Sequence, residues 1–233
     1  MTTRLERRLR SLSEGVFWPR GPLEKLRDAI HARFAVDTRA LAALRIALGG
    51  IVLLDLCHRS ASFELFYAAD GVYPRSVHEA TYGQAGTLSL HAVSDAAWFQ
   101  GALFALAGLL ALAFVVGYRT RLVGALSLAL LVSLHVRYPT VLNGGDRLLR
   151  VLLFVALLTP LGERWSIDSV RRGSVRRRVA GVGTAALLLQ PIVVFTSNAI
   201  EKRRGEHWYA GDALEIALHD SSMATSMGAA LLE

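Results

Sequence analysis

The sequence predicts an all-α integral membrane protein, a polytopic bundle of about five transmembrane helices. Apolar residues make up 53% of its 233 residues, and they fall in long blocks. Three blocks, residues 97–117, 122–136 and 179–199, approach or reach the roughly 20 residues that a helix needs to cross a bilayer. The alternation typical of strands is absent from them, and helices satisfy their own backbone groups in lipid. Two shorter blocks, residues 41–56 and 148–161, complete the expected five spans.

The first segment, residues 1–39, is basic and has no apolar run, so it is expected to be retained rather than cleaved as a secretory signal. Leu23, Leu26, Ile30 and Phe34 recur at helical spacing with charged residues between them. This pattern predicts an interfacial helix lying on the membrane surface. A helix exposed to water is the alternative.

The distribution of arginine and lysine predicts the topology. Nine basic residues precede the first span, and six arginines lie within residues 164–178. Because cytoplasmic loops are enriched in basic residues, both segments are assigned to the cytoplasm, and the loop of residues 58–96 to the outside. The expected location is the plasma membrane, with the N-terminus cytoplasmic. Since most of the arginines flank spans, they indicate contact with the lipid bilayer rather than with nucleic acid.

Two charged residues fall inside the first span. Arg45 and Asp55 are ten residues apart, so about 15 Å of helix separates them and they cannot pair with each other. Charged side chains within a span imply a partner, a wet cavity or snorkelling. We expect Arg45 to snorkel towards the cytoplasm and Asp55 to lie at the outer interface.

The connections between spans carry further signals. Aromatic residues and turn signals in residues 58–96 predict short helices that cap the bundle outside the membrane. Residues 117–121 predict a tight cytoplasmic turn, which makes a hairpin of its two neighbouring spans. Gly101, Gly108 and Gly124 are expected to let helices approach closely.

The densest polar cluster lies between the third and fourth spans and includes His135, Asn143, Asp146 and Arg150. Asn143 or Asp146 can cap the fourth span, and Asp146 can pair with Arg150 one helical turn away. The alternative is a polar pocket at one membrane face. The sequence leaves both interpretations open.

The fifth span contains Pro191 and ends near Asn198, and Lys202 and Trp208 follow. A lysine buried in a membrane has a lowered pKa and can act as a neutral base. Cys57 is the only cysteine, which excludes an internal disulfide and a thiolate metal site, and no metal site is predicted. The tail, residues 213–233, predicts at most one weakly amphipathic helix, with truncation of a longer chain as an alternative.

Taken in order, several stretches of the sequence resemble the HTTM family, the membrane domain related to vitamin K-dependent gamma-glutamyl carboxylase. The resemblance covers most of residues 37–214, within an expected bundle of residues 40–212. The matching stretches are Leu44 to Ile46 with Asp55, Tyr67 to Pro74, Gly117 to Arg121, Ser133 to His135, Leu142 to Asp146, and Lys202 to Gly205 with Trp208 and Gly211.

The resemblance implies candidate site residues and a cofactor. Lys202 matches the position of the carboxylases' catalytic base, and Asn143, Asp146 and His135 are expected to line its pocket. Vitamin K hydroquinone or another quinol is the implied cofactor, with Arg45, Asn198 and Trp208 as its expected contacts. This chain has Gly144, Gly145 and Asp146 where the carboxylases carry a histidine after the asparagine.

Three functions follow from this resemblance and from the spans. The first expectation is a membrane partner or maturation factor for a secreted or membrane protein. The alternatives are a quinol-dependent carboxylase-like enzyme and a transporter.

Overall fold

The computed structural model describes residues 22–83 and 89–219. Contacts divide the chain into two compact units, Met1–Ala185 and Ala186–Glu233. Apart from two strands of two residues each, the regular elements of the described part are helices, which confirms the predicted all-α class.

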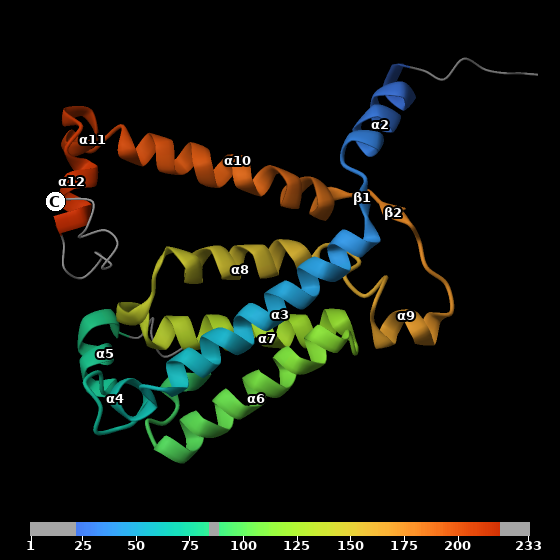
Figure 1. The fold of residues 1–233 in the computed structure, drawn as a ribbon. Coiled ribbons are helices and arrows are strands. Elements are labelled where there is room, and N and C mark those ends of the chain that lie inside the picture. Colours follow the sequence, from blue (N-terminus) through green and yellow to red (C-terminus); the bar gives the residue numbers. More distant parts are fainter. Residues whose placement is uncertain (1–21, 84–88, 220–233) are drawn as a thin grey trace, which may run out of the picture. The chain divides into compact units, whose positions relative to one another are not determined.

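The core of the first unit is formed by four helices, α3 (Thr38–Ser60), α6 (Ala97–Val116), α7 (Thr120–Arg137) and α8 (Gly144–Leu157) (Figure 1). Each packs against the next in the chain, and α8 returns to pack against α3. The helices therefore form a closed bundle. Two segments predicted to be cytoplasmic, the tight turn of residues 117–121 and the arginine-rich residues 164–178, meet at the end where α3 begins.

Four helices in the described residues are long and apolar enough to cross a membrane: α3, α6, α7 and α10 (Val182–Lys202). This finding supports a membrane protein. The predicted fourth span, residues 148–161, corresponds to α8, which has 14 residues and a length of about 21 Å, short of about 30 Å of hydrocarbon. A count of five spans stays a prediction, as does the orientation in the membrane.

The turn between α6 and α7 is as tight as predicted. Gly117 ends α6 in the left-handed region at φ +71°, and Arg119 also has a positive φ. A Cβ at Gly117 would lie 2.3 Å from Cβ of Ser166, so the position also requires glycine for space. The turn therefore requires glycine at position 117 for two reasons, its positive φ and its close contact with Ser166.

Of the three glycines predicted to lie at close helix contacts, Gly124 does and Gly101 and Gly108 do not. Gly49, which was not predicted, also lies at such a contact. A Cβ at Gly124 would lie 2.6 Å from Leu157, and one at Gly49 would lie 2.5 Å from Val115. Gly108 has no neighbour within 4 Å of such an atom in the described part of the chain, and Gly101 has only Phe63 at 4.0 Å. The expectation for Gly101 and Gly108 was wrong because neither glycine lies at a close helix contact.

Short helices follow α3, as the sequence predicts. They are α4 (Phe63–Tyr67), α5 (Arg75–Tyr82) and η2 (Leu90–Ala92), and η3 (Pro139–Val141) lies between α7 and α8. Tyr67 packs with Leu134 and Tyr138 in a buried cluster against Phe104 of α6. The aromatic residues of the loop therefore serve as a core that caps this end of the bundle.

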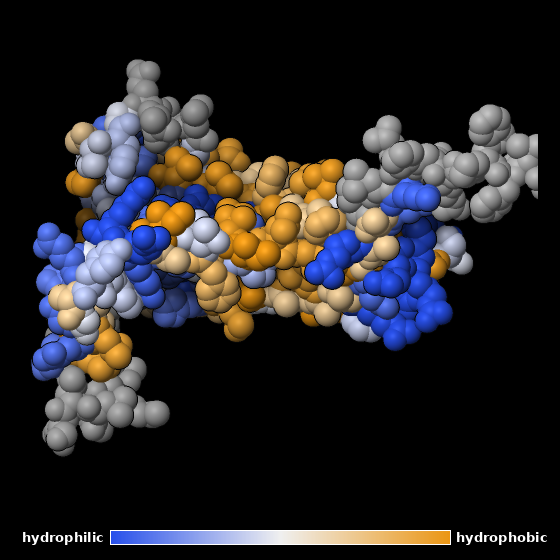
Figure 2. All heavy atoms as spheres, turned by 90° about the horizontal axis from the view of Figure 1, so that it is seen from above, coloured by the Kyte–Doolittle hydropathy of each residue, from blue (hydrophilic) through white to orange (hydrophobic). Residues whose placement is uncertain are grey.

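The opposite end joins distant parts of the first unit. Strand β1 (Val36–Asp37) pairs antiparallel with β2 (Arg178–Val179), and α9 (Ile167–Arg172) lies in the connection after α8. The N-terminal helix α2 (Pro22–Arg33) precedes β1 and confirms a helix there, while its place on a membrane stays a prediction. Residues 1–21 lie outside the described part. Figure 2 shows hydrophilic residues gathered at the end of this unit that carries α9.

Arg45 does not snorkel, contrary to our expectation. It is fully buried, and its guanidinium donates hydrogen bonds to the carbonyl oxygens of Leu161, Arg164, Trp165 and Val115. Carbonyls in the last turn of a helix and just beyond it lack helical partners, and a buried arginine satisfies several of them at once. Arg45 therefore ties the end of α6 to the connection after α8.

The second unit contains most of α10, with α11 (Glu206–Ala210) and α12 (Ala213–His219). Helix α10 continues through Pro191. Within the predicted tail, residues 213–219 form α12, and residues 220–233 lie outside the described part, so the expectation of at most one helix there stays a prediction.

Replacing Arg45 by methionine is expected to lower the melting temperature in detergent by about 6–12 °C. The change removes the donor of four carbonyls in buried or partly buried hydrogen bonds, for which we expect a loss of roughly 3 kcal/mol. The matched control is Arg39→Met, because Arg39 is exposed on the same helix and should leave the melting temperature nearly unchanged. Equal melting temperatures for Arg45→Met and wild type would contradict this role.

Candidate functional site

A network of charged groups lies at the end of the bundle where α3 finishes, and Arg59 is its centre. Nε of Arg59 donates to both carboxylate oxygens of Asp55, at 3.0 and 2.8 Å. Nη2 donates to Oδ1 of Asp146 at 2.6 Å, and Nη1 donates to the hydroxyl of Tyr67 at 3.3 Å. Arg59 and Asp146 are both buried. A buried charge is costly unless it is paired, and this ion pair gives each of the two charges its partner.

Asn143 and Asp146 form a capping box at the start of α8. Oδ1 of Asn143 accepts hydrogen bonds from the amides of Gly145 and Asp146, and Oδ2 of Asp146 accepts one from the amide of Asn143 at 2.7 Å. The capping interpretation is therefore confirmed. The ion pair of Asp146 is with Arg59 of α3 and not with Arg150, because α3 packs directly on α8.

His135 faces this network from α7. Its side chain is inaccessible to solvent, and Nε2 lies 3.7 Å from Oδ1 of Asp146, too far for a good hydrogen bond. Within residues 22–83 and 89–219, neither ring nitrogen has a hydrogen-bond partner, and the buried hydroxyl of Tyr138 also has none. Buried polar atoms are costly to leave unpaired, so these three atoms are open to hydrogen bonds from bound water.

Two cavities meet at Asp55 and Asn143. One, of about 220 Å³, also touches Arg59 and Tyr67. The other, of about 360 Å³, lies between α3 and α8, and Asp146 lies at its polar end. Its remaining walls are mostly aliphatic, formed by Leu48, Ile51, Leu148, Leu149 and Leu152. The second cavity is therefore apolar along its walls and polar at the end where the charged network lies.

Asp55, His135 and Asp146 place one ligand atom each within 4.8 Å of one another, which is compact enough for a metal ion. However, Arg59 already donates to both carboxylates of this group. A metal ion would face the positive charge of Arg59 at close range, so the guanidinium takes the place that a cation would fill. The arrangement suits a neutral polar ligand better than a metal ion.

The other predicted site residues lie elsewhere. Arg45 is 14 residues before Arg59, about 21 Å along α3, and it holds main-chain carbonyls. In the second unit, Nζ of Lys202 lies 3.9 Å from the ring centroid of Trp208, a cation–π contact, and Asn198 is exposed on α10. Participation of Lys202, Asn198 and Trp208 in one site with Asn143 stays a prediction.

Sequence reasoning missed Arg59 and Tyr67 as members of the site. Asp55 and Arg59 are four residues apart at the end of an apolar span, a spacing that indicates a helix-surface ion pair. That signal was present. Their contact with Asp146 depends on the packing of α3 against α8, which the sequence does not display.

The fold and this site define an all-helical protein with four helices able to cross a membrane and a buried charged network at one end of the bundle. No family model, curated protein or solved structure matches the chain.

Replacing Arg59 by methionine is expected to lower the melting temperature by about 6–12 °C or more. The variant leaves Asp146 buried, and Asp55 partly buried, without their cation, and breaking a buried pair costs about 3–5 kcal/mol. Adding Asp146→Asn to Arg59→Met should recover part of the loss, since one unpaired charge disappears. Arg147→Met, an exposed neighbour on α8, is the control. An unchanged melting temperature in Arg59→Met would show that the network does not hold the bundle.

Proposed function

We propose that the chain is an HTTM-family integral membrane protein that binds a lipid-soluble molecule of the quinol class between α3 and α8. The observation that carries the proposal is the cavity of about 360 Å³, with aliphatic walls and a polar end at Asp55, Asn143 and Asp146. Small-molecule sites in proteins are usually of this size, mainly apolar, with a few polar groups that fix orientation.

The polar groups at the end of the cavity suit hydroxyl or carbonyl oxygens on a flat ring. Asp55 offers carboxylate oxygens as acceptors, and the amide NH₂ of Asn143 offers a donor that the capping box does not use. Asp146 is fixed on both sides, by Arg59 and by the amide of Asn143. These residues therefore present donors and acceptors in fixed positions, which lowers the entropic cost of binding.

A bound quinol supplies two electrons and acidic hydroxyl protons. The residues of this chain would bind and orient it: the aliphatic walls would pack against the ring, and Asp55 would accept a hydrogen bond from a ring hydroxyl. In the carboxylase-like form of the proposal, Lys202 would be the base that removes a ring-hydroxyl proton, and oxygen would take up the two electrons.

Purified protein in detergent is expected to bind a reduced naphthoquinone saturably. Leu152→Trp places a large ring in the cavity and should weaken binding about tenfold or more, since it competes for the same volume. The control is Leu109→Trp, because Leu109 is exposed on α6 and does not line the cavity. Absence of saturable binding in folded wild-type protein would reject the proposal.

Oxygen uptake in the same samples separates binding from catalysis. If Lys202 is the base, Lys202→Ala abolishes uptake while naphthoquinone binding persists, and the control Arg204→Ala keeps both. Binding without oxygen uptake in the wild type would remove the enzymatic form of the proposal and keep the binding site.

A second candidate, a membrane partner or maturation factor for another protein, is favoured by α10. This helix is apolar, and only 11% of its span window is buried within the chain. Ile192 and Phe195 are exposed over most of their surface. An apolar helix so exposed is covered by lipid or by another membrane helix.

Photo-crosslinking in native membranes tests this candidate. A photoreactive residue at position 195 should give one discrete protein adduct, because a partner helix would cover Phe195 at a fixed register. The same residue at position 109, exposed on α6, is the control and should give only lipid adducts. Lipid adducts alone at both positions would reject a stable partner on α10.

A further inference from the structure

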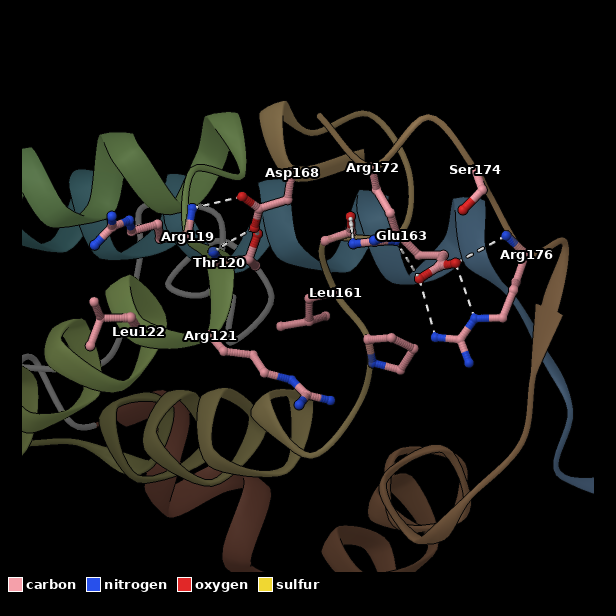
Figure 3. A pocket seen from close by; sticks show the side chains of 12 residues that line it. Arg119, Thr120, Arg121, Leu122, Leu161, Glu163, Asp168, Arg172, Ser174 and Arg176 are labelled. Carbon is pink, nitrogen blue, oxygen red and sulfur yellow. Dashed lines mark hydrogen bonds and ion pairs between the residues drawn. The ribbon is translucent and has the colours of Figure 1, made fainter. Parts of the chain in front are cut away.

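A third and larger cavity, of about 640 Å³, lies at the basic end of the bundle (Figure 3). It is bounded by the turn between α6 and α7, by the connection after α8, and by α9 with the residues that follow it. Its polar lining comprises Arg119, Thr120, Arg121, Glu163, Asp168, Arg172, Ser174 and Arg176. Since Arg59 lies at the far end of α3, this cavity is separate from the candidate quinol site.

Glu163 is already satisfied by the chain itself. It accepts hydrogen bonds from Nε, Nη2 and the amide of Arg176, and from Nη1 of Arg172 at 2.9 Å. The hydrogen bond from the side chain of Arg176 is the main reason that the pKa of Glu163 lies below its ordinary value. Glu163 is therefore ionised at neutral pH and has no need of a further cation.

Asp168 is satisfied in the same way. It accepts hydrogen bonds from the amides of Arg119 and Thr120 and from the hydroxyl of Thr120 at 2.7 Å, so it caps α7. Partial burial acts to raise the pKa of Asp168, but these hydrogen bonds outweigh it and the pKa lies below its ordinary value. The carboxylates of Glu163 and Asp168 are therefore both satisfied by hydrogen bonds within the chain.

The charges around the cavity do not balance. Four arginines, Arg119, Arg121, Arg172 and Arg176, line the cavity together with two carboxylates, which leaves a net charge of +2. In the part of the chain that the structure describes, Arg121 forms no hydrogen bond or ion pair, although its guanidinium borders the cavity (Figure 3). The excess positive charge indicates an anionic ligand.

The chemistry of the lining points to phosphate. Planar guanidinium groups match phosphate oxygens in pairs, and a phosphomonoester carries about −1.5 to −2 charges at neutral pH, close to the excess of +2. Leu122, Pro160 and Leu161 add an apolar wall beside the arginines. Because Arg121 lies in the first turn of α7, a candidate span, the cavity lies where a lipid headgroup can reach it.

We propose that the cavity around Arg121 binds a phosphomonoester group, carried by a membrane lipid or by a soluble metabolite. This site does not depend on the proposed quinol function, since it shares no residue with it.

The test uses the full chain, purified in detergent and immobilised, with two probes. Phosphatidate is the lipid probe, with phosphatidylcholine as its reference, and glycerol 3-phosphate is the soluble probe. Arg121→Gln should weaken binding about tenfold, because one charge-assisted contact is lost while no internal partner is left unpaired. Ser174→Asp, which adds a negative charge to the lining, should weaken it similarly. Arg39→Gln, the control, makes the same charge change at the same end of the bundle, outside the cavity, and should bind as wild type.

The outcomes are distinct. Saturable binding of phosphatidate that is sensitive to Arg121→Gln and Ser174→Asp, but not to Arg39→Gln, supports the site with lipid as its source. Equal sensitivity with glycerol 3-phosphate, which displaces phosphatidate, supports a soluble source. Equal weakening by Arg39→Gln and Arg121→Gln would show only diffuse attraction between charges and would overturn the site, as would absence of saturable binding to either probe.

Discussion

The bundle depends on the pairing of charges that are buried away from water. Helix α3 carries one such charge near each end, Arg45 near its start and Arg59 near its finish. Arg45 holds the carbonyls at the end of α6 and after α8, and Arg59 joins α3 to α8 through Asp146. An unpaired charge buried among packed helices is costly, so these contacts constrain how the helices can pack. Packing of small residues, as at Gly124, then fills the space between them.

The same constraint produces the candidate sites. Arg59 keeps Asp55 and Asp146 together at the end of an aliphatic cavity, which gives polar groups in fixed positions next to an apolar wall. At the opposite end, Glu163 and Asp168 already accept hydrogen bonds from within the chain, and the arginines that line the cavity outnumber these carboxylates. One end of the bundle is therefore suited to a neutral polar ring and the other to an anion. In both proposals, polar or charged groups that contacts within the chain do not satisfy indicate the complementary groups of the ligand.

The span helices were largely predictable, and the roles of their polar residues were not. Residues 97–117 were expected as a span and form α6 to within one residue, because a continuous apolar run permits only a helix in lipid. The capping of α8 by Asn143 was also open to prediction, since it involves residues three apart. By contrast, Arg45 was expected to snorkel. Its carbonyl partners lie up to 120 residues away in the chain, and no local pattern reveals them.

By itself, the sequence determined the all-helical class, the positions of the apolar helices, the tight turn at Gly117 and the local cap at Asn143. Each of these follows from hydropathy or from backbone chemistry within a few residues. Only the tertiary structure decided that Asp146 pairs with Arg59, that neither ring nitrogen of His135 has a hydrogen-bond partner among the described residues, and that four arginines line one cavity. These facts depend on which helix faces are brought together. That choice is a property of the whole packed bundle, because it reflects the joint satisfaction of charges that lie far apart in the chain.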